Sequence, residues 1–240
     1  MRKVKDFVCG ELSGWKADEI AWMVFCLASI TGLSLWWQEP PTMIVAAVSG
    51  MMYTLLAGKG KASCYLFGLV NAPLYMYASW QEQYYGDVAL NGFYLLMMLP
   101  GFMAWQRNRH AGNPGAGVKK TALSAMERWL WLGGMTLATF VLGVLLMALD
   151  GAYPLCDAAT NVLSIAAMIL TVKRCVEQWP LWIAVDLIEV FMWYKVDGDG
   201  EVSLLLMWLL FLANGCILGW RWCRELKRER EMSTRQSVVD

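Results

Sequence analysis

Charge, histidine and closely spaced cysteine pairs are all scarce in this chain. Only 17% of its 240 residues are charged, 20 basic residues balance 20 acidic ones, and His110 is the single histidine. A chain without net positive charge has no electrostatic basis for binding nucleic acid. None of the seven cysteines forms a Cys-x-x-Cys pair, so the usual spacings of zinc, haem and iron–sulfur sites are absent. We therefore expect no metal and no cofactor.

Apolar side chains, in contrast, are in large excess. Hydrophobic residues make up 58% of the chain, whereas a soluble domain contains roughly 45–50%. A core cannot bury this surplus, so part of it must face lipid. The composition excludes a disordered chain, a disulfide scaffold and an ordinary cytosolic enzyme. It predicts an all-α integral membrane protein, because a helix pairs its own backbone polar groups inside a bilayer.

Eight apolar stretches approach the roughly 20 residues that a helix needs to cross the hydrocarbon. They are Ala17–Trp37, Thr42–Ala57, Ala62–Trp80, Gly86–Trp105, Trp129–Leu149, Pro154–Val172, Pro180–Tyr194 and Val202–Trp222. Nineteen lysines and arginines lie on one side of these spans, and only Lys195 lies on the other. Because loops rich in Lys and Arg stay in the cytoplasm, both termini are predicted to be cytoplasmic.

Aromatic residues gather at both ends of the predicted spans. Tryptophan and tyrosine are enriched at membrane interfaces, so anchoring accounts for most of them without any functional role. The outer group is Trp36, Trp37, Trp80, Tyr84, Tyr85, Tyr153, Trp193 and Tyr194, and the inner group is Trp15, Trp22, Trp105, Trp129, Trp131, Trp179, Trp220 and Trp222.

A shift of 115 residues aligns the second to fourth spans with the sixth to eighth. The matched pairs are Ser49 with Ser164, Leu55 with Leu170, Lys59 with Arg174, Leu66 with Leu181, Asn71 with Asp186, Leu90 with Leu205 and Trp105 with Trp220. Both three-helix units start outside and end inside, so they are parallel copies, and one extra crossing must join them. Parallel repeats are typical of transporters with a site between the halves, near mid-membrane.

The sequence therefore predicts eight transmembrane helices in a 1+3+1+3 order, as two parallel three-helix bundles joined by a linker helix. The predicted segments are a cytoplasmic N-terminus with a leading helix (1–40), the first bundle (41–106), a basic cytoplasmic loop with the linker helix (107–152), the second bundle (153–223) and a polar, mobile cytoplasmic tail (224–240). The Gly-rich segment Arg107–Lys120 reads as a flexible linker.

Polar residues inside the spans are costly and mark candidate site positions. Trp182 and Asp186 share a helix face, and an aromatic ring beside a carboxylate favours a flat cation through cation–π attraction and charge pairing. The full set of candidate substrate-binding residues is Trp182, Asp186, Asn71, Asn91, Tyr94, Asn161, Asn214 and Trp179. Hydrogen bonding between helices is the alternative for Asn161 and Asn214, and an internal ion pair is the alternative for Asp186.

Several short runs resemble the PnuC family of bacterial vitamin B3 transporters. These are Trp179-x-x-Trp182-x-x-x-Asp186, Gly86-Asp87-x-x-Leu90-Asn91, Tyr65-x-x-Gly68-x-x-Asn71 and Gly219-Trp220. The resemblance covers about 41–222. It implies a fold like that of the SWEET sugar transporters, a homotrimer in the bacterial inner membrane, and facilitated diffusion of nicotinamide riboside. It also implies a cytoplasmic kinase that phosphorylates and traps the substrate.

The candidate residues suit that substrate. Trp182 can stack on its pyridinium ring, Asp186 can balance the charge, and Asn71 and Asn91 can bond the carboxamide or ribose. A phosphate would require Arg or Lys in the cavity, so the mononucleotide is disfavoured. A carrier for another flat cationic vitamin such as thiamine is the main alternative. An enzyme lacks a catalytic constellation here, and a channel would need rings of carbonyls or charges along a pore.

Overall fold

A computed structural model describes residues 2–81, 83–109, 117–148, 153–195 and 201–239 of the chain. His110 and most of the Gly-rich linker, residues 110–116, lie outside the described residues. The helices are α1 (Arg2–Leu12), α2 (Ala17–Trp36), α3 (Pro41–Gly58), α4 (Cys64–Gln81), α5 (Tyr85–Arg107), α6 (Ala125–Ala148), α7 (Pro154–Val172), α8 (Gln178–Lys195) and α9 (Glu201–Val239).

The predicted spans coincide in position with α2 to α9. Among the described helices, α2, α3, α5, α6, α7 and the segment Leu205–Met232 of α9 are long and apolar enough to cross a membrane. Polar and aromatic residues lower the hydropathy of α4 and α8, so a count of eight crossings stays a prediction. Two features were not predicted: α1 forms within the charged leader, and α9 continues as a helix to Val239, where a mobile tail was expected.

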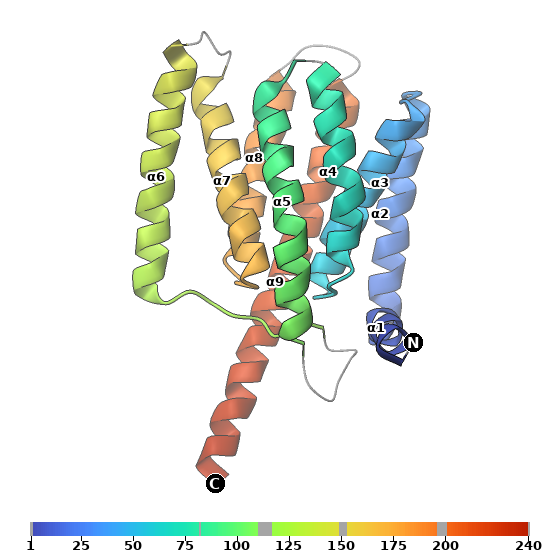
Figure 1. Cartoon of the computed structure of the whole chain (residues 1–240), viewed down its shortest axis with the longest axis vertical. Helices are drawn as coiled ribbons and strands as arrows, with labels where there is room; N and C mark the ends of the chain where they lie inside the picture. Colours follow the sequence, from blue (N-terminus) through green and yellow to red (C-terminus); the bar gives the residue numbers. More distant parts are fainter. Residues whose placement is uncertain (1, 82, 110–116, 149–152, 196–200, 240) are drawn as a thin grey trace.

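Neighbouring helices pack in a regular pattern (Figure 1). The helices α3, α4 and α5 pack in chain order, and so do α7, α8 and α9. α5 also packs on α7, and α3 packs on α9, while α2 lies on α3 and α6 lies on α7. Exchanging α2–α5 for α6–α9 converts each of these contacts into another member of the same set. A further contact, between α2 and α9, has no counterpart between α6 and α5 among the described residues.

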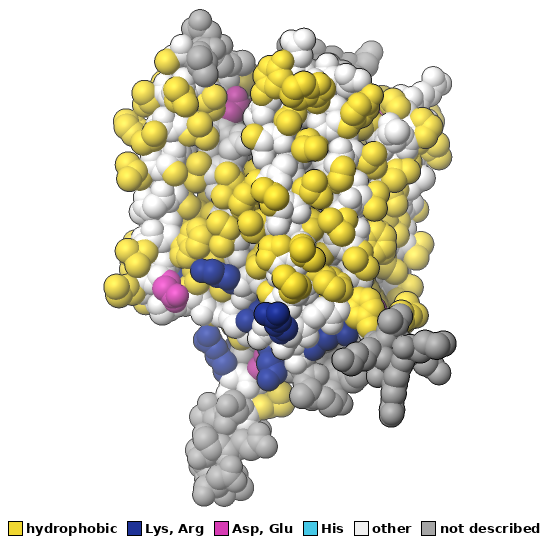
Figure 2. Space-filling model, in the orientation of Figure 1, with side chains coloured by type: hydrophobic (Ala, Val, Ile, Leu, Met, Phe, Trp, Pro, Cys, Tyr) yellow, Lys and Arg dark blue, Asp and Glu magenta, His cyan; other side chains and the backbone are white. Residues whose placement is uncertain are grey.

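The surface separates an apolar flank from a charged end. Figure 2 shows hydrophobic side chains over most of the height of the molecule, with Lys and Arg gathered towards one end. α1 and the last turns of α9 lie at that same end (Figure 1). We call it the basic end, and define it by the turns after α3 and α7, which contain Lys59, Lys61, Lys173 and Arg174.

α3 and α7 begin and end in the same way. Pro41 and Pro154 occupy their first turns, where a missing N–H costs nothing. Both helices close in a Schellman motif. Gly60 (φ +73°) and Arg174 (φ +64°) adopt the left-handed conformation, and their N–H groups donate to Ala57 O and Thr171 O, each at 2.9 Å. The two helices therefore end in matched turns at the basic end.

Two buried tryptophans complete these helix ends across the molecule. Trp105 of α5 donates its indole N–H to Thr171 O of α7 at 2.8 Å, and Trp222 of α9 donates to Gly58 O of α3 at 2.7 Å. Both indoles are fully buried, at 0% exposure. The last carbonyls of a helix have no partner within it, so these bonds satisfy groups that water cannot reach. We call these two donor–acceptor pairs the indole clasp.

Aromatic packing surrounds the indole clasp. The rings of Trp105 and Trp222 lie 6.0 Å apart, Tyr65 packs edge-on against Trp105 at 5.3 Å, and Trp179 packs against Trp222 at 5.8 Å. Gly101 leaves room for Tyr65, since a Cβ there would lie 2.2 Å from its ring. Interfacial anchoring is thus wrong for Trp105, Trp179 and Trp222, because their rings pack inside the protein.

Residues 117–124 form a strap across the basic end. Val118 N donates to Gly60 O, and Thr121 N donates to Arg174 O, both at 2.9 Å. The acceptors are the left-handed residues of the two Schellman motifs, so the strap bonds the same point in each. Val118 is 1% exposed and Lys120 is 6% exposed. The prediction of a flexible linker is therefore wrong for Val118 and Lys119, whose backbone N–H groups donate to Gly60 O and Asn108 O.

The first helix is held against the turn between α3 and α4. The buried Lys61 ammonium donates to Gly10 O at 2.7 Å and Ser13 O at 2.9 Å, at the end of α1. Glu11 pairs with Arg109 and accepts from Ser63. Burial, helped by the nearby Lys59, lowers the pKa of Lys61 to about 8. These polar contacts fix α1 at the basic end.

We predict that Trp222→Phe destabilises the protein more than Trp220→Phe. The first change leaves Gly58 O without its indole donor in a buried site, which costs about 1–3 kcal/mol. Trp220 is 61% exposed, with Arg224 over its ring, and serves as the control two residues away. Thermal unfolding of the two purified variants in detergent measures the difference. Equal midpoints would show that the Trp222 bond does not stabilise the helix ends.

Candidate functional site

Trp182 lies where α5, α7 and α8 meet. Its ring faces Tyr94 of α5, with ring centroids 6.2 Å apart and an interplanar angle of 55°. Its Nε1 donates to Thr171 Oγ1 of α7 at 3.3 Å. The side chain is half-buried. Of the residues that the sequence analysis selected, Trp182 and Tyr94 are therefore brought together from separate helices.

Asp186 lies one helical turn after Trp182 on α8 and is 7% exposed. It faces α9 at Gly215, where a Cβ would lie 3.6 Å from Asp186 Oδ2. Glu189 is the charged group that acts on it electrostatically. No described lysine or arginine forms an ion pair with Asp186. The described residues thus offer no internal ion pair to explain a buried carboxylate here.

Tyr94 connects this pair to α3 and α7. It interacts with Ser164 of α7 and, electrostatically, with Glu189. Tyr53 of α3 lies near enough to interact with Tyr94, and its hydroxyl donates to Met168 Sδ at 3.5 Å. The sequence analysis missed Tyr53. A signal was present, because Tyr53 and Met168 are 115 residues apart, which is the offset of the repeat.

Asn91 and Asn161 have the same local geometry on neighbouring helices. Asn91 Nδ2 donates to Asp87 O at 2.9 Å on α5, and Asn161 Nδ2 donates to Asp157 O at 2.8 Å on α7. Asp87 and Asp157 interact electrostatically across the α5–α7 contact. In both asparagines the described contacts engage the amide nitrogen, so the amide oxygen remains an acceptor. These residues lie towards the end opposite the basic end.

The structure gives Asn71 and Asn214 packing contacts. Asn71 Nδ2 donates to Ala46 O of α3 at 2.7 Å. Asn214 is 1% exposed. Its Oδ1 accepts from Trp22 Nε1 at 3.0 Å, and its Nδ2 donates to Thr54 Oγ1 at 3.3 Å. Since both ends of the Asn214 amide are used to join α2, α3 and α9, we assign it to helix packing.

Trp179 is a buried member of the hydrophobic cluster against which Trp182 and Tyr94 pack. It is 4% exposed and belongs to the aromatic packing around the indole clasp. A Cβ added to Gly219 would come within 2.9 Å of its side chain. The sequence analysis counted Trp179 among the candidate substrate-binding residues, but its ring is buried in the cluster and packs against Trp222.

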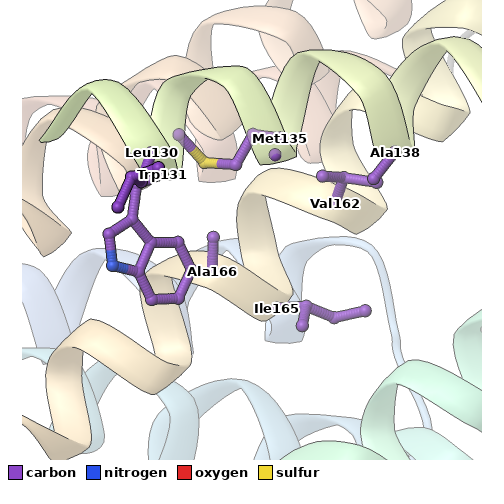
Figure 3. A pocket seen from close by; sticks show the side chains of 8 residues that line it. Leu130, Trp131, Met135, Ala138, Val162, Ile165 and Ala166 are labelled. Atoms are coloured by element: carbon purple, nitrogen blue, oxygen red, sulfur yellow. The ribbon is translucent and has the colours of Figure 1, made fainter. Parts of the chain in front are cut away.

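A separate groove of about 320 Å³ opens between α6 and α7. Figure 3 shows Leu130, Trp131, Met135 and Ala138 of α6 facing Val162, Ile165 and Ala166 of α7. No charged side chain lines this groove, so the groove offers no opposite charge to a cationic substrate. Within the described part of the chain, no group of three His, Cys, Asp or Glu residues could hold a metal ion.

Comparison with known proteins identifies relatives over most of the chain. Residues 40–224 match the family model described as nicotinamide mononucleotide transporter. The nicotinamide riboside transporter PnuC of Neisseria mucosa is 32% identical, covering 90% of this chain and 84% of that protein. The PnuC protein of Haemophilus influenzae is 29% identical over 90% of this chain and 94% of its own, and that of Escherichia coli is 29% identical over 77% and 85%.

The fold agrees with a solved structure. A crystal structure of the vitamin B3 transporter PnuC superimposes with a TM-score of 0.79 at 32% identity, covering 92% of this chain and 97% of that one. The family and the structural neighbour are transporters and not enzymes. The apolar helices and these matches together show that the chain is a multi-pass membrane protein and belongs to the PnuC family of transporters.

Proposed function

We propose that this chain carries nicotinamide riboside across the bacterial inner membrane by facilitated diffusion. The observation that carries the proposal is an indole and a buried carboxylate one helical turn apart on α8, Trp182 and Asp186, the carboxylate with no described basic partner. Nicotinamide riboside contains a flat pyridinium cation, and such a cation stacks on an aromatic face and pairs with a carboxylate. The names of the relatives support the same substrate.

The remaining polar groups suit the uncharged parts of the substrate. Tyr94 offers a hydroxyl next to Trp182, and Asn91 and Asn161 offer amide oxygens on the adjoining helices. These groups match the hydroxyls of ribose and the carboxamide. We therefore place the site between α5, α7 and α8, and leave Asn214 and Trp179 to packing. Asn71 stays a candidate, because its described hydrogen bond also engages only the amide nitrogen.

The family model bears the name of the mononucleotide, but the charges favour the riboside. A phosphate group is bound by Arg or Lys. α3, α4 and α7 contain neither, and α5 and α8 carry one each, Arg107 and Lys195, at their final residues. Both basic positions are thus the last residues of their helices, and Asp186 lies nine residues before the end of α8. A thiamine carrier is the alternative, because thiamine is also a flat cation.

The proposed architecture is eight crossings in a 1+3+1+3 order, with α3–α5 and α7–α9 as the two bundles, α6 as the linker helix and the termini in the cytoplasm. The matched contacts of the two helix sets support it. Tyr53 and Met168, equivalent under the 115-residue shift, touch each other. Equivalent residues of two related units meet only beside their common axis. We also propose a homotrimer, and a cytoplasmic kinase that traps the substrate.

Transport is proposed to be uncoupled from ion gradients. A proton relay needs a chain of acidic or histidine residues through the membrane. Between the depth of Asp186 and the basic end, α3, α4, α5, α7 and α8 contain neither type of residue. The substrate can therefore move only down its own gradient.

Uptake into proteoliposomes tests the function directly. We expect labelled nicotinamide riboside to equilibrate across the membrane, with saturable counterflow, and never to accumulate. Unlabelled nicotinamide riboside should compete better than thiamine, and the mononucleotide should compete least. Preferred competition by thiamine would support the alternative substrate. Accumulation driven by a proton or sodium gradient would contradict facilitated diffusion, and uptake without saturation would indicate a channel.

We expect Trp182→Ala to weaken binding of nicotinamide riboside while the protein stays folded. Loss of a stacking cation–π contact in a desolvated site costs about 2 kcal/mol or more, which is roughly a 30-fold loss of affinity. Calorimetry on purified protein measures the change. Trp36→Ala is the control, because that ring is 82% exposed. Equal affinities in the two variants would assign Trp182 to packing.

Asp186→Asn separates the charge of this side chain from its shape. Opposite charges about 5 Å apart attract by roughly 3 kcal/mol at an effective dielectric constant near 20. The variant should therefore bind the pyridinium form on the order of 100-fold more weakly. The neutral dihydropyridine form, which keeps the ribose and carboxamide, should bind wild type and variant alike. Equal losses for both ligands would show that Asp186 is structural.

A further inference from the structure

Thr171 is the next-to-last residue of α7 and is 1% exposed. Its side chain and its backbone contact two different tryptophans. The hydroxyl meets Trp182 of the proposed site, and the carbonyl meets Trp105 of the indole clasp. A single residue therefore touches both the proposed site and the joint between α5 and α7.

The hydroxyl of Thr171 is set to accept a hydrogen bond. Its one proton is donated to Ala167 O at 2.8 Å, so only lone pairs remain for other partners. Trp182 Nε1 supplies the donor, at 3.3 Å. An indole has one N–H group, and this bond fixes the rotation of the ring about its side-chain bonds. The plane that Trp182 offers to a cation is thereby determined by Thr171.

The carbonyl of Thr171 accepts two hydrogen bonds of its own. It accepts the Trp105 indole at 2.8 Å and the Arg174 N–H at 2.9 Å. Trp105 is fully buried, packs on Trp222 and Tyr65, and so fixes the end of α7 against α5. Any separation of α5 from α7 at the basic end would shift Thr171, and with it the hydroxyl that orients Trp182.

We propose that Thr171 is a positioning residue that orients the Trp182 ring for substrate and links substrate binding to closure of the basic end. This inference rests on the proposed function. Because linkage is reciprocal, a closed indole clasp strengthens substrate binding, and bound substrate strengthens the clasp. When the basic end opens, the Trp182 ring loses its fixed orientation and binds substrate less tightly. This favours release of substrate towards the basic end.

Thr171→Val tests the positioning role, since valine keeps the shape and removes the hydroxyl. We expect the affinity for nicotinamide riboside, measured by calorimetry, to fall about 3- to 10-fold. Thr171→Ser keeps the acceptor and should restore it. Thr136→Val on α6 is the matched control, because Thr136 also donates to the carbonyl four residues earlier but lies exposed on another helix.

A spectroscopic signal separates positioning from general stability. The indole N–H resonance of Trp182, assigned by its loss in Trp182→Phe, should move upfield in Thr171→Val and stay in place in Thr171→Ser. The proposal is overturned if Thr171→Val binds substrate as wild type does, or if serine fails to restore affinity. Wild-type protein that binds no nicotinamide riboside would instead refute the proposed function, while the resonance would still report whether Thr171 orients Trp182.

The link to the clasp is tested by a double-mutant cycle. Trp105→Phe removes the donor to Thr171 O and should weaken substrate binding, although Trp105 lies in the clasp and not in the site. If it acts through Thr171, the loss in Trp105→Phe combined with Thr171→Val will be smaller than the product of the two single losses. Losses that multiply fully, or no loss in Trp105→Phe, would contradict the link.

Discussion

The satisfaction of the carbonyl groups at the ends of α3 and α7 is the constraint on which the rest of this structure depends. Both helices end within the protein, where an unpaired carbonyl is costly. Schellman turns satisfy part of each end, and the two indoles satisfy another part. Trp222 belongs to α9 and Trp105 belongs to α5. The bonds that satisfy the ends of α3 and α7 therefore also fix α9 against α3 and α5 against α7.

The geometry of the proposed site depends on these contacts. Trp182 is oriented by Thr171, which also receives a bond of the indole clasp, and Tyr94 reaches Trp182 from the helix that carries Trp105. Gly215 of α9 lies next to the Asp186 carboxylate and has no side chain to fill the space there. Residues of α5, α7, α8 and α9 therefore form one unit, and a change at the basic end acts on the site through packed side chains.

The polar groups of the membrane region divide into two functional kinds. Asn214 uses both its donor and its acceptor between helices, as packing residues in membranes do. Asp186 has no described basic partner and lies one helical turn after Trp182, which suits a ligand that brings its own positive charge. The spacing of residues along a helix could not distinguish a packing residue from a site residue, since Asn214 and Asp186 are each a polar residue in an apolar span. The contacts made by neighbouring helices distinguish them.

The sequence by itself determined the helical membrane class, the positions of α2 to α9 and the common helix face of Trp182 and Asp186, because these depend on local hydropathy and on the 3.6-residue period of one helix. Only the tertiary structure decided that Trp105, Trp179 and Trp222 are buried, that the strap is bonded to both helix ends, and that Tyr53 and Thr171 approach the site. Composition cannot distinguish an interfacial tryptophan from a buried one, because both are amphipathic rings near a helix end. For Trp105 and Trp222 the difference is a carbonyl acceptor on a helix far away in the chain, and for Trp179 it is packing against the Trp222 ring.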